Sequence, residues 1–439
     1  MMRSDRSGSR AVTENRTAPG GRRPSGIAAK AVTAALLINL LSGAQYCWSM
    51  LGSGLMEQHG WTILQVSLPY SVLFVTASVW SLAVGRIVDK KGPGAMIRLG
   101  AVLNVIGLAA AGNTDNWWLV LFSVGIVMGM AAASLAQSTS PTAIRFVPLR
   151  YKGIVTGIVS AGIGWTSFYM APLIDTLLRL TDVSMCFTVI GVTDGALLFI
   201  LSFFLPDPHK YSLEQENDDP GAGIGRISGY NDSIQTVGQA LHTRETWILF
   251  MMLLCATLAG LVFTSQVTNI ARVQAGITDS CRIIMFMGIV NGLGRLVMPA
   301  LSDLIGVIRT WAVIFVTIAL DMILFLTADS FPVFVAAVCL LSFFYGGSTP
   351  LMWATITDIF GKKYMGTIYG VVTNGYAAAS VLGPVSASLI VQKTGSYTLL
   401  FVLIIIFSLS GLALVRYLSL MKIQENAENR DTAEDLQCL

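Results

Sequence analysis

Charged residues are scarce in this chain of 439 residues, of which Asp, Glu, Lys and Arg together make up only 12%. Soluble domains carry about a quarter charged residues, so the composition excludes an ordinary soluble protein. The net charge of +3 gives no basic surface for nucleic acid. Three histidines and six cysteines without CxxC spacing predict no metal site, no cofactor site and no disulfide framework, and no nucleophile–base set indicates an enzyme.

Apolar residues, in contrast, are abundant and come in long runs. They make up 54% of the chain, and the mean hydropathy is +0.67. Examples are the runs 197–205, 246–263 and 397–415. A helix needs about 20 apolar residues to cross roughly 30 Å of hydrocarbon, and runs of this length are helical rather than alternating. The sequence therefore predicts an all-α membrane protein whose main surroundings are the lipid bilayer.

The apolar runs divide the chain into twelve expected spans in two groups of six. The spans are expected at 28–56, 66–86, 94–113, 117–139, 151–177, 184–205, 246–272, 281–304, 309–328, 332–357, 365–391 and 396–421. The expected units are a disordered N-terminal tail (1–27), a six-helix bundle (28–205), a linker (206–244), a second six-helix bundle (245–421) and a C-terminal tail (422–439).

The distribution of Lys and Arg predicts the orientation of the spans. If both termini are cytoplasmic, only Arg179, Arg272, Arg282 and Lys393 of the 28 Lys and Arg fall on the outer side, and Arg295 lies within the membrane. Cytoplasmic loops carry an excess of Lys and Arg, so the bias supports twelve spans independently of hydropathy. We expect a monomer in a bacterial inner membrane, with both tails and the linker in the cytoplasm.

The two halves repeat each other. The segment GIVTGIVSAG that starts at Gly153 matches GTIYGVVTNG that starts at Gly366, with all three glycines aligned. The loop from Gly85 to Gly92 has a counterpart that runs from Pro299 to Gly306. Parallel repeats of this kind are typical of transporters that hold substrate near the bilayer midplane between the halves.

The Gly85–Gly92 loop resembles the signature between helices 2 and 3 of the major facilitator superfamily. Three segments resemble the oxalate/formate antiporter family within the monocarboxylate transporter group: YCWS at 46–49, the same loop through Pro93, and NGLGR at 291–295. The resemblance covers roughly residues 28–421. It implies the major facilitator fold, two pseudo-symmetric six-helix bundles around one path, and secondary transport by alternating access.

Arg295 is the sharpest functional signal because it interrupts the apolar run 283–301. A charge at the bilayer centre costs about 2.5–3.5 kcal/mol on insertion scales. An arginine stays charged, and its fork matches a carboxylate in bidentate geometry. We expect it to bind an anionic substrate, and the resemblance implies the same role; the alternative is a buried ion pair with Asp321. Asn291, one turn earlier, is expected either to donate to the same anion or to join helices.

The charge of the substrate follows from a departure from the family pattern. The oxalate carrier of this family has a second cation, a lysine, in the eleventh helix, and the aligned residue here is Asn374. A single cation would leave a dicarboxylate half uncompensated in a low-dielectric cavity. We therefore expect a small monocarboxylate such as formate, lactate or pyruvate.

Aromatic residues recur in the helices expected to line the path. Such side chains cage a small anion or pack and anchor helices, and both interpretations stay open. The aromatic candidates for substrate binding are Tyr46, Trp48, Trp165, Tyr169, Tyr345 and Tyr376.

Two further groups of polar residues have expected roles. Asp194 and Asp321 are carboxylates within spans and are candidates for proton coupling, although hydrogen-bonded structural roles are favoured for helices at the periphery. Residues of the repeated loops are expected to make ion pairs that hold one conformational state. These gating candidates are Gly85, Arg86, Asp89, Lys90, Gly92 and Asp303.

An unpaired Arg295 favours exchange of one anion for another, because the empty site keeps an uncompensated charge. Two alternatives remain. One is a proton-coupled carboxylate symporter, and the other is an exporter of hydrophobic compounds that uses the aromatic lining. A sensor built on a transporter fold would need a signalling domain for which neither tail nor linker is long enough.

Overall fold

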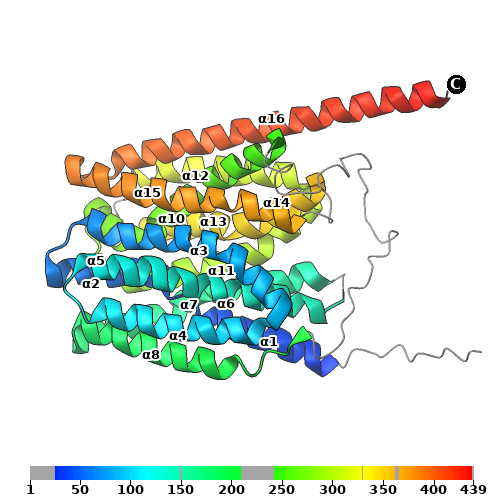
Figure 1. Cartoon of the computed structure of the whole chain (residues 1–439). Coiled ribbons are helices and arrows are strands. Elements are labelled where there is room, and N and C mark those ends of the chain that lie inside the picture. Colours follow the sequence, from blue (N-terminus) through cyan, green and yellow to red (C-terminus); the bar gives the residue numbers. More distant parts are fainter. Residues whose placement is uncertain (1–24, 149–150, 209–241, 329, 361–364, 438–439) are drawn as a thin grey trace, which may run out of the picture.

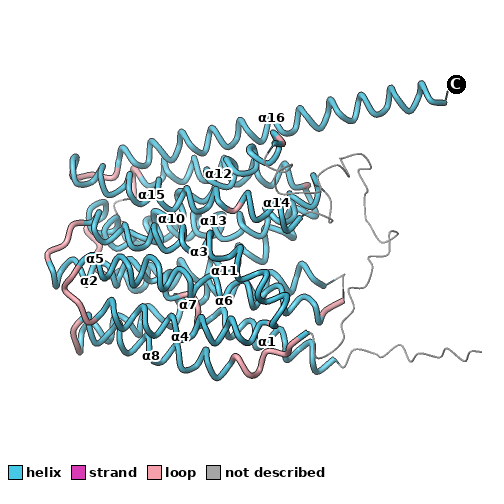
Figure 2. The backbone as a smooth tube through the Cα atoms, viewed as in Figure 1, coloured by secondary structure: helices cyan, strands magenta, loops and turns pink. Residues whose placement is uncertain are grey.

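A computed structural model of the chain describes residues 25–148, 151–208, 242–328, 330–360 and 365–437. Figure 2 shows that these residues form helices joined by loops, without a strand among them. Within these ranges, 12 helical spans are long and apolar enough to cross a membrane. The twelve spans and the all-α fold expected from hydropathy are therefore confirmed.

The first six spans occupy the lower part of Figure 1, from blue to green. Several of them are assembled from shorter pieces, because the helix axis bends or changes its pitch within the span. The pieces are α1 (Ser25–Leu41), η1 (Ala44–Cys47), α2 (Trp48–His59), α3 (Ile63–Lys91), α4 (Pro93–Gly112), α5 (Trp117–Val120), η2 (Leu121–Met128), α6 (Gly129–Ala143), η3 (Ile144–Phe146), α7 (Lys152–Leu180) and α8 (Val183–Leu201).

The last six spans occupy most of the upper part of Figure 1. They are α10 (Arg244–Ala275), α11 (Ser280–Ile305), α12 (Val307–Phe325), α13 (Phe331–Phe360), α14 (Met365–Val372) with α15 (Asn374–Thr394), and α16 (Thr398–Gln437). The helix α16 continues well past the expected end at 421, since a helix can extend beyond the bilayer once its residues become polar. The expected N-terminal tail and linker lie for the most part outside the described residues.

The repeated loop found in the sequence recurs in the backbone. Gly92 ends α3 with φ 78°, and Gly306 ends α11 with φ 90°. Each donates its N–H to the carbonyl four residues earlier, in Val88 and Ser302. Residues with a side chain rarely adopt positive φ, so both loops need glycine at this point. The repeat between the halves is thus a repeat of backbone conformation.

The first span differs from the unbroken helix expected at 28–56. The helix α1 ends at Leu41, and η1 joins it to α2. The Leu40 carbonyl accepts hydrogen bonds from Thr166 Oγ1 at 2.6 Å and from the Tyr169 hydroxyl at 3.2 Å, both in α7. Backbone groups freed at membrane depth must be satisfied by neighbours, and these bonds do so. The break places Tyr46, in η1, near the middle of the bundle.

The two ends of the bundle, the linker end and the distal end, differ in the helices that begin or end there. At the linker end α8 ends and α10 begins, and at the distal end α2 ends and α11 begins. In Figure 1 the linker end lies to the right, where α16 projects beyond the other helices.

The break in the first span gives a test of the fold. Thr166→Val removes the shorter hydrogen bond to the Leu40 carbonyl, and we expect the free energy of unfolding to fall by about 0.5–1 kcal/mol. Tyr169→Phe removes the longer bond and should have a smaller effect. Thermal unfolding of the purified variants measures both. An unchanged melting temperature in Thr166→Val would show that this carbonyl does not need its partner.

Candidate functional site

Arg295 lies in the middle of α11 and is 8% exposed. Its Nη2 donates to the Tyr46 hydroxyl at 2.7 Å, and its Nε donates to Asn291 Oδ1 at 3.1 Å. Within the described part of the chain, no carboxylate forms an ion pair with it. Its partners are therefore neutral, and the guanidinium keeps a net positive charge in a buried place. The alternative of an ion pair with Asp321 is wrong.

Arg295 lines a cavity of about 270 Å³, the central cavity, which lies between the two halves. Most of its residues come from the middle or the linker-end part of their helices, so the cavity extends from Arg295 toward the linker end. The lining residues are Gln45, Tyr46, Phe74, Ala77, Ser78, Ser81, Ala132, Ala133, Ala136, Gln137, Ile163, Leu253, Arg295, Thr349, Tyr369, Thr373, Tyr376 and Ala377.

Three of the predicted site residues, Arg295, Tyr46 and Tyr376, meet in this cavity. The Tyr376 ring packs edge-on against Phe74 with centroids 5.3 Å apart, which joins α15 to α3 across the halves. Tyr345 lies behind Tyr376, 2% exposed, and their hydroxyls are 2.6 Å apart. One cation, two tyrosine hydroxyls and an apolar wall suit a small anion with an apolar or planar body.

Tyr369 was missed from the sequence, although it lines the cavity beside Arg295 and Tyr376. Its ring stacks on Trp353 with centroids 3.8 Å apart. Helical spacing indicates this residue, because Tyr369, Thr373 and Tyr376 share one helix face and Tyr376 is a predicted site residue.

Comparisons with known proteins agree with the fold described above. The sequence profile of the Major Facilitator Superfamily matches residues 34–384 and, in an overlapping second match, 269–435. The chain belongs to the Major Facilitator Superfamily. Its fold and its membrane spans follow from that membership, and like its relatives it is a transporter rather than an enzyme.

Several of the similar proteins are named for small organic anions. The oxalate:formate antiporter of Oxalobacter formigenes is 26% identical over 80% of this chain and 82% of its own. A probable sulfoacetate transporter of Cupriavidus necator is 23% identical over 79% and 83%. Monocarboxylate transporter 10 of the rat is 23% identical over 76% and 67%. The resemblance to the oxalate/formate antiporter family and the monocarboxylate transporter group is thereby confirmed.

Four other predicted site residues do not line the cavity and make bonds or packing contacts within the protein. Trp48 donates its Nε1–H to the Val66 carbonyl at 3.0 Å and is 2% exposed. Tyr169 bonds the Leu40 carbonyl, as described above. Trp165 packs on the bare backbone of Gly292 in α11. Asn374 is exposed, binds two carbonyls of α14 and accepts from Ser78 Oγ at 3.0 Å.

The carboxylates proposed for proton coupling lie outside the central cavity. Asp194 in α8 is 3% exposed and Asp321 in α12 is 1% exposed. Among the residues that the structure describes, one oxygen of Asp194 and both oxygens of Asp321 find no hydrogen-bond partner. Neither residue lines the cavity that contains Arg295. A coupling role for them stays a prediction, and it would have to act at a distance from the substrate.

The predicted gating residues lie at the linker end. Arg86, Lys90 and Asp303 are exposed and make no ion pair with the described side chains, while the side chain of Asp89 is outside the description. Gly85 has open space around its Cα, and Gly92 lies against the carboxylate of Asp207. Their role in holding a conformational state stays a prediction.

The distal end is closed by hydrogen bonds between the halves. Gln266 of α10 donates to Ser67 of α3 at 2.9 Å, and Thr268 of α10 donates to Ser49 of α2 at 3.2 Å. Ser71 of α3 donates to the Ser380 carbonyl of α15 at 2.6 Å. All of these hydroxyl and amide groups are buried. Beyond them, a second cavity of about 390 Å³, the distal cavity, lies between α2, α7, α10 and α11.

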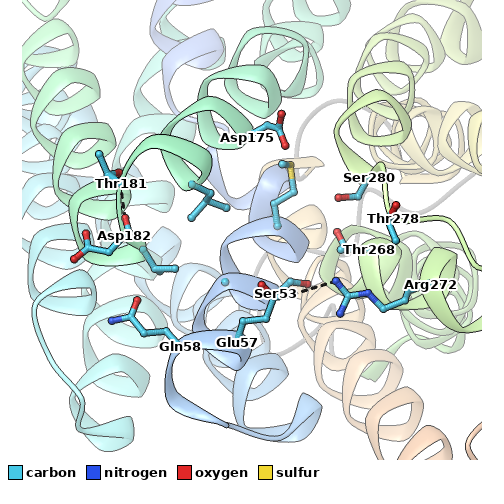
Figure 3. A pocket seen from close by; sticks show the side chains of 14 residues that line it. Ser53, Glu57, Gln58, Asp175, Thr181, Asp182, Thr268, Arg272, Thr278 and Ser280 are labelled. Carbon is cyan, nitrogen blue, oxygen red and sulfur yellow. Dashed lines mark hydrogen bonds and ion pairs between the residues drawn. The ribbon is translucent and has the colours of Figure 1, made fainter.

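An ion pair crosses the distal cavity. Figure 3 shows Glu57 of α2 and Arg272 of α10 meeting there, and Nη2 of Arg272 is 3.1 Å from a Glu57 oxygen. The side chains are 68% and 51% exposed, so the pair contributes at most about 1 kcal/mol. A weak pair between the halves can break in each transport cycle.

Charge exchange tests this pair. Glu57→Lys alone places two cations at the closure and is expected to slow transport several-fold, while Glu57→Lys with Arg272→Glu should recover most of the rate by restoring attraction. Uptake into proteoliposomes at low salt measures both variants. Arg282→Glu, at an arginine whose partner Asp279 lies in the same half, is the matched control. Equal rates in the single and the double variant would show that the pair does not contribute to the closure of the distal end.

Proposed function

We propose that this protein is an exchanger of small organic anions, in particular monocarboxylates such as formate, lactate or pyruvate. One observation carries the proposal: the buried guanidinium of Arg295 lines the central cavity with neutral partners only. A substrate carboxylate supplies the missing negative charge, and it binds most strongly through two parallel N–H···O bonds. The names of the relatives, which include oxalate, formate, sulfoacetate and monocarboxylates, support the same class of substrate.

The single cation sets the charge of the preferred substrate. Asn374, in the place that aligns with a lysine of the oxalate carrier, contributes no charge, and it lies beside Ser78 at the edge of the cavity. A cavity of about 270 Å³ suits a small acid better than a large hydrophobic compound. We therefore favour a monocarboxylate over oxalate, and a carboxylate over a hydrophobic drug-like molecule.

The mechanism that fits is alternating access with a charge-dependent closed state. The structure has its cavity toward the linker end and its closure at the distal end, which we assign to the cytoplasm and the outside respectively because Lys and Arg gather at the linker end. Closing both ends around an empty site would bury an uncompensated arginine, which carries a desolvation penalty of several kcal/mol. A bound carboxylate removes that penalty, so loaded carriers reorient and empty ones do not. We place this exchanger in a bacterial cytoplasmic membrane.

Substitution of Arg295 tests the proposal. Arg295→Gln removes the charge and Arg295→Lys removes the fork, and we expect each to lower carboxylate exchange by at least about hundredfold, since breaking a buried charge contact costs about 2–5 kcal/mol. Counterflow of labelled formate, lactate or oxalate into loaded proteoliposomes measures this. Arg282→Gln, an exposed arginine in the same helix, should keep the wild-type rate. Wild-type exchange in Arg295→Gln would show that the guanidinium does not bind the substrate.

The same vesicles separate exchange from its alternatives. Strict dependence of uptake on internal anion supports the exchanger, whereas acid-driven uptake into empty vesicles would establish a proton symporter instead. Transport of hydrophobic compounds without competition by carboxylates would favour the exporter.

A second cation should change the preferred substrate. We expect Asn374→Lys to shift the ratio of oxalate to formate uptake upward by about tenfold, equivalent to ~1.4 kcal/mol, because Asn374 bonds Ser78 of the cavity lining and a lysine there would bring a second positive charge to the edge of the cavity. Asn374→Gln is the neutral control and should leave the ratio unchanged. An unaltered ratio in Asn374→Lys would mean that charge at this position does not select the substrate.

A further inference from the structure

Asn291 lies one turn before Arg295, is fully buried and does not line the central cavity. Its Oδ1 accepts the Nε–H of Arg295 at 3.1 Å, and its Nδ2 donates to the Ser342 carbonyl of α13 at 3.3 Å. A guanidinium only donates and a carbonyl only accepts, so one orientation of the amide serves both partners. Both the oxygen and the nitrogen of the amide thus have hydrogen-bond partners within the protein.

Two glycines from neighbouring helices pack closely against Asn291. A Cβ on Gly164, in α7 of the N-terminal half, would lie 2.8 Å from Asn291 Oδ1 and 2.9 Å from the backbone nitrogen of Gly292. A Cβ on Gly346 in α13 would overlap the Asn291 carbonyl and lie 2.9 Å from its Nδ2. Neither place has room for a methyl group. The backbone of α7 therefore packs directly on the group that orients Arg295.

The bonds of Arg295 show what this orientation achieves. Nε is held by Asn291 from its own half, and Nη2 is held by Tyr46 from the other half. Nη1 has no hydrogen bond to any of the described residues. Both N–H groups of Nη1 and one N–H of Nη2 are thereby left for a ligand, and a guanidinium binds a carboxylate most strongly through two parallel N–H···O bonds. A neutral amide orients the guanidinium and leaves its positive charge uncompensated, whereas a carboxylate in its place would neutralise that charge.

We propose that Asn291 is a positioning residue that sets the direction of the Arg295 fork and links it to the packing of α7 on α11. This inference rests on the proposed function, and Asn291 acts through Arg295 without touching the anion. When the two halves rock, Gly164 moves relative to Asn291, so the alignment of the fork with the bound carboxylate changes with the conformational state. Substrate affinity then differs between the two faces of the membrane.

Kinetics of Asn291 variants test the positioning role. We expect Asn291→Ala to raise the KM for formate and lactate exchange by about tenfold with a smaller change in maximal rate, because the fork loses its orientation but keeps its charge. Asn291→Asp should be more damaging than Asn291→Ala, since the new carboxylate would pair with Arg295. Thermal unfolding of each purified variant confirms that it is folded. Wild-type KM in Asn291→Ala, or transport by Asn291→Asp equal to the wild type, would overturn the positioning role.

Substitution of two glycines where α7 crosses α11 tests the link between Asn291 and α7. Gly164→Ala and Gly288→Ala both wedge α7 away from α11, because a Cβ on Gly288 would lie 2.5 Å from Ser167 Cβ and 2.6 Å from the Gly164 carbonyl. Only the Gly164 variant reaches Asn291. We expect both to slow transport and only Gly164→Ala to raise KM several-fold; equal KM changes in the two variants would overturn the link. This pair decides the question if the Asn291 variants fail to fold.

Failure of the two proposals can be told apart. If the wild type exchanges none of formate, lactate and oxalate, the proposed function and the positioning role both fall. If the wild type exchanges them and Asn291→Ala matches its KM, only the positioning role falls.

Discussion

A positive charge buried among neutral partners is the constraint on which the functional arrangement of this transporter depends. The guanidinium of Arg295 is held by a tyrosine of the other half and by an amide one turn earlier in its own helix, and the residue lines a cavity between the halves. Such a charge is costly to enclose without a counter-ion. In the exchange mechanism that we propose, this cost links the charge of the ligand to the closure of the carrier.

Holding that charge requires a departure from regular helix in the first span. Tyr46 reaches Arg295 because α1 ends at Leu41 and η1 turns the chain before α2 begins. The carbonyl released by this break accepts from Thr166 and Tyr169, which are themselves buried or partly buried in α7. These two residues, of which Tyr169 is a lining candidate in the sequence, thus stabilise the irregular backbone. Their contribution to the site is indirect, through the position of Tyr46.

The two ends of the bundle differ in how the halves meet. At the distal end, serine, threonine and glutamine side chains bond across the halves, and an exposed ion pair lies beyond them. Each such bond contributes on the order of 1 kcal/mol, so the closure is made of many weak contacts rather than one strong lock. The central cavity lies on the other side of Arg295. This asymmetry is what a carrier caught with one gate closed would have.

The sequence by itself determined the twelve spans, the internal repeat and the isolated arginine, because hydropathy and charge are properties of single segments in a bilayer. Only the tertiary structure decided which polar and aromatic side chains share the cavity. Trp48, Trp165 and Tyr169 have the same composition signal as Tyr46 and Tyr376, yet they bond or pack elsewhere. A helix in a bundle has several buried faces, and the direction of each depends on neighbours more than a hundred residues away along the chain, such as Leu40 for Thr166 and Tyr46 for Arg295. The sequence of one span therefore does not specify which face meets the path.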